Sequence, residues 1–159
     1  MAFYFSPYEI ALMAIETEEA GMIFYTKVAN LMKDGESKKM LVFLAEQESK
    51  HKEIFEKLAK DTEKQYPEAE YAIDVHARMA SILDMIKRKS FDLDGVTSDS
   101  INLVQALDVG IQTEIQSISV YQLARKTMID AFAPVLDPII SEEESHLELL
   151  SGLRKKQTA

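Results

Sequence analysis

The sequence feature that most restricts the fold is a Glu-x-x-His spacing that occurs twice. Glu48 and His51 form the first pair, and Glu143 and His146 form the second, so two of the three histidines follow a glutamate by three residues. In a helix, residues three apart lie on the same face, and both side chains of each pair can therefore reach one cation. The rest of the sequence predicts helices that bring the two pairs face to face.

The composition favours a single all-α domain. The chain has 159 residues, 47% of them hydrophobic, with only five glycines and four prolines, as expected for long amphipathic helices. A formal net charge of −9 argues against nucleic acid or an anionic membrane as a partner. There is no cysteine, which excludes disulfides, thiol catalysis and iron–sulfur centres within this sequence. No signal peptide or membrane-spanning run is recognised, and we expect a cytoplasmic protein.

Four long helices are predicted, arranged as two hairpins. The first begins at a capping box formed by Ser6 and Glu9, with a proline in the first turn. Residues 66–97 read as a long crossover between the hairpins, with a short helix at 74–89. His76 lies in this crossover and is expected to be a surface or packing histidine. The predicted long helices cover residues 7–33, 36–65, 98–129 and 132–156.

Two further glutamates interrupt apolar helix faces. Glu18 lies on the apolar stripe of the first helix, and Glu114 lies on that of the third. Burying an unpaired charge costs several kcal/mol, so these glutamates need a partner. Glu18 and the first Glu-x-x-His pair stand a similar number of residues from the turn near Asp34, so they should lie at the same height along the hairpin. The levels agree less well in the second hairpin, where an irregular connection around the prolines would absorb the difference.

The two halves of the sequence repeat the same pattern. At an offset of 96 residues, Glu18 and Tyr25 match Glu114 and Tyr121. At an offset of 95 residues, the first Glu-x-x-His pair matches the second. Two hairpins with the same internal order can pack about a pseudo-twofold axis. That packing would place four glutamates and two histidines around one point in the core.

Four ionised carboxylates in a dry core would repel one another and become protonated, whereas two divalent cations would neutralise them. Carboxylate and imidazole donors suit iron or manganese, and also zinc. Such donors can hold two metal ions about 3.5–4 Å apart, and a pair of iron ions would add redox chemistry. The predicted metal ligands are Glu18, Glu48, His51, Glu114, Glu143 and His146.

The stretches that carry these residues resemble the rubrerythrin branch of the ferritin-like di-iron carboxylate proteins. They are residues 14–25, 45–51, 114–121 and 142–146. The resemblance implies a ferritin-like four-helix bundle with two iron ions and a homodimer, in which the crossover would allow exchange of helices. The implied activity is reduction of hydrogen peroxide or oxygen, or oxidation of iron.

The resemblance also implies a role for each residue. Glu18 and His51 would be terminal ligands of one iron, Glu114 and His146 would be those of the other, and Glu48 and Glu143 would bridge. Tyr25 and Tyr121 would donate hydrogen bonds to the ligands, although a core tyrosine with a satisfied hydroxyl explains them as well.

Two features depart from the rubrerythrin pattern. Rubrerythrins carry a rubredoxin domain with a four-cysteine iron site, and this sequence has no cysteine. We therefore expect the electrons to come from a separate donor protein such as a rubredoxin. Rubrerythrins also carry an extra glutamate three residues after the third-helix ligand, where this chain has Ser117. This leaves two alternatives, a ferroxidase or iron-handling protein and a non-enzymatic bundle stabilised by metal.

Overall fold

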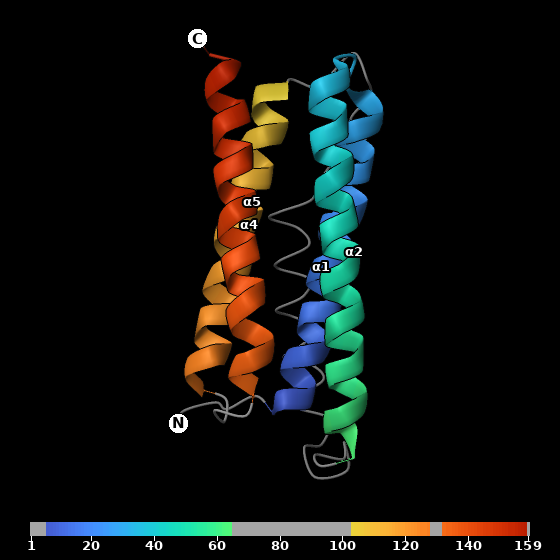
Figure 1. Cartoon of the computed structure of the whole chain (residues 1–159), viewed down its shortest axis with the longest axis vertical. Coiled ribbons are helices and arrows are strands. Elements are labelled where there is room, and N and C mark those ends of the chain that lie inside the picture. Colours follow the sequence, from blue (N-terminus) through green and yellow to red (C-terminus); the bar gives the residue numbers. More distant parts are fainter. Residues whose placement is uncertain (1–5, 65–102, 128–131, 159) are drawn as a thin grey trace.

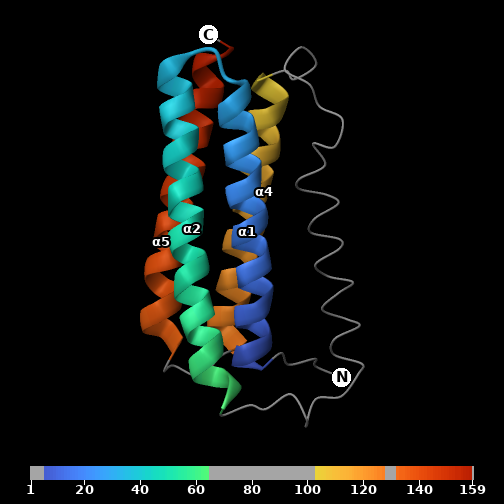
Figure 2. The same ribbon diagram turned by 90° about the vertical axis from the view of Figure 1, so that its right-hand side faces the viewer.

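The described part of the protein forms a bundle of four long helices. The computed structural model describes residues 6–64, 103–127 and 132–158. Its helices are α1 (Pro7–Leu31), α2 (Gly35–Glu63), α4 (Leu103–Thr127) and α5 (Ala133–Lys156). α1 packs against α2 and α4 packs against α5, and the two hairpins lie side by side (Figures 1 and 2). The predicted all-α four-helix bundle is confirmed.

The direction of the helices requires a crossover between the hairpins. α1 and α5 run one way along the bundle, while α2 and α4 run the other way (Figure 1). The end of α2 and the start of α4 therefore lie at opposite ends of the bundle. The predicted crossover helix at 74–89, His76 and the outermost parts of the predicted helix 98–129 lie outside the described residues.

Capping residues set the ends of the first hairpin. The backbone N–H of Glu9 donates to Ser6 Oγ, and the Ser6 N–H donates back to Glu9 Oε2, which completes the predicted capping box. α1 ends at Leu31 rather than at residue 33, because Met32 has an extended backbone. The side chain of Asp34 then accepts the Ser37 N–H at 2.7 Å and starts α2. This short connection makes α1 and α2 antiparallel neighbours.

The prolines of the last helix occupy its first turns. α5 begins at Ala133 with Pro134 in its first turn, while Pro138 lies inside the helix. Proline is well suited to a first turn, where its missing N–H would have no helical partner. At Pro138 it removes one backbone hydrogen bond. The sequence left the start of this helix uncertain by one turn, and the structure places it before both prolines.

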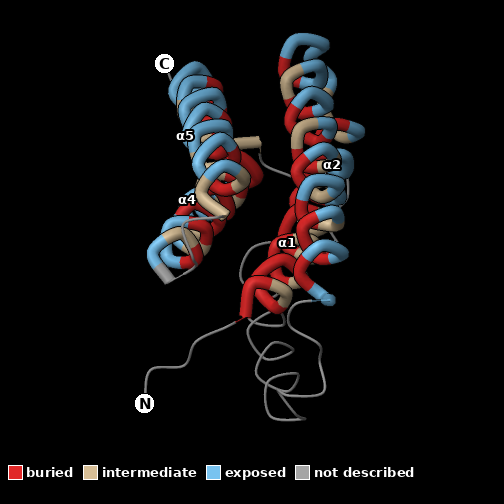
Figure 3. The backbone as a smooth tube through the Cα atoms, turned by 60° about the horizontal axis from the view of Figure 1, so that its bottom comes forward, coloured by how far each residue is buried: buried red, intermediate tan, exposed pale blue. Residues whose placement is uncertain are grey.

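The core consists of two apolar clusters with a polar layer between them. Buried residues follow the facing sides of the helices (Figure 3). The Phe24 cluster includes Phe24, Tyr25, Leu44, Leu107 and Leu150. The Phe55 cluster includes Ile10, Phe55, Tyr121, Leu136 and Ile139. On each helix, the glutamates and histidines singled out in the sequence lie between the residues of the two clusters.

None of the described helices combines the length and the apolarity that crossing a bilayer needs.

Candidate metal centre

The structure brings together all six side chains that the sequence predicts as metal ligands. α1 and α4 supply one glutamate each, and α2 and α5 supply one Glu-x-x-His pair each. All six residues are buried, with at most 5% of their surface exposed. The sequence predicted the relative heights of the second hairpin's residues less well. The structure places Glu114 in the same layer as Glu143 and His146. These residues are Glu18, Glu48, His51, Glu114, Glu143 and His146.

The six residues divide into two overlapping groups of four. The first group is Glu18, Glu48, His51 and Glu143, and the second replaces Glu18 and His51 by Glu114 and His146. Within each group, one ligand atom from every residue lies within 4.8 Å of the others. Glu48 and Glu143 belong to both groups. This sharing is the geometry that two bridging carboxylates require.

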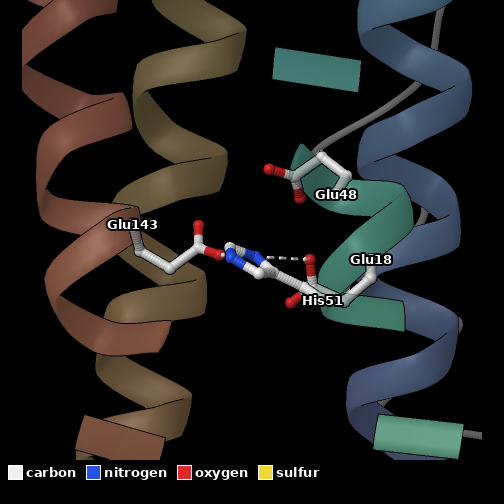
Figure 4. A group of neighbouring side chains, drawn as sticks. All are labelled: Glu18, Glu48, His51 and Glu143. Carbon is white, nitrogen blue, oxygen red and sulfur yellow. Dashed lines mark ion pairs between the residues drawn. The ribbon is translucent and has the colours of Figure 1, made fainter. Parts of the chain in front are cut away.

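Both histidines present the Nδ1 atom to the centre of the layer. The Nδ1 atom of His51 lies 2.8 Å from Glu143 Oε1 and 3.4 Å from Glu18 Oε2 (Figure 4). The Nδ1 atom of His146 lies 3.2 Å from Glu48 Oε1 and 3.7 Å from Glu143 Oε2. The two rings stack with their centroids 5.7 Å apart. The two oxygens of Glu143 therefore face two different histidines, as a bridging carboxylate would.

The centre contains polar atoms without hydrogen-bond partners. In the described part of the chain, every buried side-chain atom of this kind belongs to the six residues. Buried polar atoms normally have a hydrogen-bond partner, and a concentration of carboxylate and imidazole atoms without one is what a cation site presents. The residues therefore fit a binuclear metal site. The atoms without a hydrogen-bond partner are Glu18 Oε2, Glu48 Oε1, His51 Nδ1, both Glu143 carboxylate oxygens and His146 Nδ1.

The carboxylates and the histidine shift one another's pKa values. Burial raises the pKa of Glu48 and of Glu114 well above the usual value. Repulsion from the Glu18 carboxylate adds to the shift at Glu48, and a hydrogen bond with Glu143 adds to the shift at Glu114. Burial opposes the charge of Glu143, but pairing with His146 and His51 outweighs it and lowers the pKa of that carboxyl. Burial also opposes the charge of His51, yet its pairing with Glu143 and Glu18 raises its pKa to about 11. Protons thus take the place of cation charge when no metal is bound.

Two buried tyrosines connect the hairpins at this layer. The Tyr25 hydroxyl on α1 donates to Glu114 Oε1 on α4, and the Tyr121 hydroxyl on α4 donates to Glu18 Oε1 on α1. Burial, and next the adjacent Glu114 or Glu18 carboxylate, raises the pKa of each hydroxyl well above its usual value. Both hydroxyls therefore stay protonated as donors. The expected hydrogen bonds to the glutamates are present, while a catalytic role remains a prediction.

Sequence reasoning missed two residues that shape the centre. Gly21 lies one turn after Glu18, and a Cβ there would be 2.7 Å from Glu48 Oε2. A glycine inside a helix, matched at the offset of 96 by the buried Ser117, was the available signal. The second residue is Glu142, whose Oε2 lies 2.7 Å from His51 Nε2. In the sequence nothing distinguishes Glu142 from the other acidic residues near Glu143.

Comparison with known proteins identifies the class and then the family. A solved structure from Thermotoga maritima, of a protein assigned to the ferritin-like diiron-carboxylate proteins, matches with a TM-score of 0.67. The identity is 23%, and the match covers 98% of this chain and 99% of that one, so it confirms the predicted ferritin-like fold. A sequence model described as rubrerythrin matches residues 9–154. The chain therefore belongs to the rubrerythrin family, as the resemblance predicted. The search of curated proteins gave no significant match.

Proposed function

We propose that the protein is a di-iron oxidoreductase that reduces hydrogen peroxide, or oxygen, at the buried glutamate and histidine layer. One observation carries this proposal: two four-residue groups share Glu48 and Glu143, so each group offers carboxylate and imidazole donors while two carboxylates span both. Membership of the rubrerythrin family supports a redox function for such a centre.

Each side chain has a proposed ligand role. Glu18 and His51 would hold one iron as terminal ligands, and Glu114 and His146 would hold the other. Glu48 and Glu143 would be shared by the two ions, which is supported by the position of the Glu143 oxygens between the two histidines. Iron is the proposed metal because the reaction needs redox capacity, although the same donors accept manganese and zinc.

When both ions are ferrous, the pair supplies two electrons, and hydrogen peroxide takes up these and two protons to give two water molecules. The protein contributes orientation and a dry site. The hydrogen bonds from Tyr25 and Tyr121 fix the carboxylates of Glu114 and Glu18, and the raised pKa of each tyrosine keeps its proton next to the centre. The apolar clusters on both sides of the layer keep bulk water away.

The electron donor and the assembly are also proposed. The 159 residues contain no cysteine, so reduction would come from a separate protein such as a rubredoxin. We propose a homodimer in the cytoplasm. Reduction of the ferric protein by rubredoxin, followed by absorbance, tests the donor, and gel filtration with light scattering tests the dimer.

Oxidation of iron by oxygen is the second candidate function. The observation that favours it is Ser117, which is 6% exposed and occupies the position of the extra rubrerythrin glutamate. Without that carboxylate, the six-residue ligand set is the one that ferritin-type ferroxidase centres share. A ferroxidase would oxidise repeated additions of ferrous iron with oxygen.

Stopped-flow mixing separates these functions. The metal-free protein is loaded anaerobically with two equivalents of ferrous iron and mixed with hydrogen peroxide or with oxygen. A peroxide reductase consumes one peroxide per two irons, faster than the same iron free in buffer. The matched control is the His51→Ala/His146→Ala protein with the same iron.

Peroxide consumption no faster than that of free iron contradicts the peroxidase proposal. Faster oxidation of the bound iron by oxygen than by hydrogen peroxide supports the ferroxidase. No oxidation by either oxidant supports the non-enzymatic bundle stabilised by metal.

A further inference from the structure

The outer nitrogen of His51 is held by a carboxylate from the opposite hairpin. Its Nε2 atom lies 2.7 Å from Oε2 of Glu142 on α5, while its Nδ1 atom faces Glu18 and Glu143. When Nε2–H donates to Glu142, the neutral ring carries its lone pair on Nδ1, on the side of the metal group. Histidines that bind metals commonly donate their other N–H in this way, which fixes the tautomer and strengthens the ligand.

The second histidine lacks this support. At the offset of 95, the counterpart of Glu142 is Gln47, which carries an amide in place of a carboxylate. In the described part of the chain, the carboxylates within 4.0 Å of His146 approach its Nδ1 atom, and none approaches its Nε2 atom. The two halves of the centre therefore differ just outside the ligands, although the ligands themselves repeat.

We propose that Glu142 is a positioning residue that holds His51 with its Nδ1 lone pair toward the metal group, so that the metal position at His51 binds a divalent cation more tightly than the position at His146. This inference rests on the proposed two-metal centre and adds an order of filling to it. Losing such a supporting carboxylate typically weakens metal binding by about 10–100-fold. The Glu142 side chain is 54% exposed, so water screens the contact and we expect the lower end, about tenfold.

An anaerobic cobalt titration of the full-length protein tests this order. Metal-free protein is titrated with Co²⁺ against a competing chelator, and binding is followed by the visible absorption of the ion. The wild-type protein should bind two ions with affinities about tenfold apart. Glu142→Gln should weaken the tighter site about tenfold and leave the weaker one unchanged. Glu144→Gln is the matched control, because Glu144 is an exposed neighbour on the same helix and its replacement removes the same charge.

Proton NMR of the cobalt-loaded protein gives a readout that a general loss of structure would not produce. Each ligating imidazole has one exchangeable ring N–H, whose signal the cobalt ion shifts far from the others. The N–H that donates to Glu142 should exchange more slowly with water than that of His146. In Glu142→Gln only this signal should exchange faster, whereas Glu144→Gln should keep both signals as in the wild type.

The outcomes separate this inference from the function on which it rests. A protein that binds no cobalt at the centre overturns both. Two bound ions whose affinities and N–H signals are unchanged in Glu142→Gln overturn the role of Glu142 and leave the two-metal centre standing. Equal weakening of both sites in Glu142→Gln also overturns the inference, because it shows a general structural effect.

Discussion

The polar middle layer and the two apolar clusters lie on the same four helices but are stabilised differently. In the clusters, side chains such as Leu44 and Phe55 are fully buried and contact other apolar groups, which needs nothing from outside the chain. In the middle layer, six buried polar atoms have no hydrogen-bond partner, and the pKa values of several groups are far from usual. The clusters are stabilised by contacts within the chain alone, whereas the buried carboxylates of the middle layer need cations or protons to balance their charge.

The middle layer also connects the hairpins. Tyr25 contacts Glu114 and Tyr121 contacts Glu18, in each case between α1 and α4. By contrast, the ion pairs of Lys52 with Glu19 and of Arg154 with Asp108, which lie outside the layer, each join helices of one hairpin. Metal occupancy should therefore affect how the two hairpins are held together. A substitution in the layer should therefore change metal binding, and a substitution in a cluster should change mainly the free energy of unfolding.

The largest expected effect follows from removing both histidines of the layer. The His51→Ala/His146→Ala protein should lose tight metal binding, with affinity falling more than about 100-fold, because a direct ligand matters more than a supporting residue. Metal analysis after dialysis measures this. His76→Ala, which removes the remaining histidine of the chain, is the control and should keep about two ions. An unchanged metal content in the double variant would contradict the ligand assignment.

The opposite change removes a large side chain from a cluster and leaves the layer intact. Phe55→Ala should lower the free energy of unfolding by about 3–5 kcal/mol, since Phe55 is fully buried and leaves a cavity. Its metal content should stay at that of the wild type. Urea unfolding of the metal-free protein, with metal analysis of the folded protein, measures both quantities. A parallel loss of metal would show that cluster and layer are not independent.

The pH dependence of the metal-free protein gives a smaller effect, with a defined sign. The folded pKa of His51 is about 11 against an ordinary 6.5, so its contribution to stability is complete below pH 6.5 and declines as the pH rises toward 11. Glu48 and Glu114 have raised pKa values, so their contribution also declines as the pH rises above 4.5. Glu143 has a lowered pKa, and its contribution is lost only in acid, below this range.

The free energy of unfolding of the metal-free protein should therefore fall between pH 6.5 and 8.5. The metal-loaded protein should change less, because cations bind more strongly as protons leave. Urea unfolding at both pH values, with chelator or with metal, measures the difference. Metal-free stability that rises across this range would contradict the proposed protonation of the layer.

The smallest effects are expected from replacing either of two helical glycines by alanine. In Gly21→Ala the new methyl would lie 2.7 Å from Glu48 Oε2, so the carboxylate must move, and metal affinity should fall about tenfold. In Gly152→Ala nothing lies within 4 Å of the new methyl. That variant should keep its affinity and gain about 0.5–1 kcal/mol of unfolding free energy, because alanine suits a helix better than glycine. Equal metal affinity in both variants would remove Gly21 from the description of the centre.

The membership of the middle layer could be predicted from the sequence, because helical spacing and hairpin length determine which residues share a face and a level. The Glu-x-x-His pairs, together with Glu18 and Glu114, meet for that reason. The contact between Glu142 and His51 could not be predicted. It depends on the rotation of α5 relative to α2 and on one rotamer, neither of which spacing determines. The early end of α1 at Met32 depends on local backbone geometry in the same way.

Anomalous diffraction from iron-loaded crystals would show whether the layer binds two metal ions. We expect two iron peaks about 3.5–4 Å apart, one next to the Nδ1 atom of His51 and one next to that of His146, with Glu48 and Glu143 between them. A layer that contains no iron, or iron bound only outside it, would contradict the proposed two-metal centre.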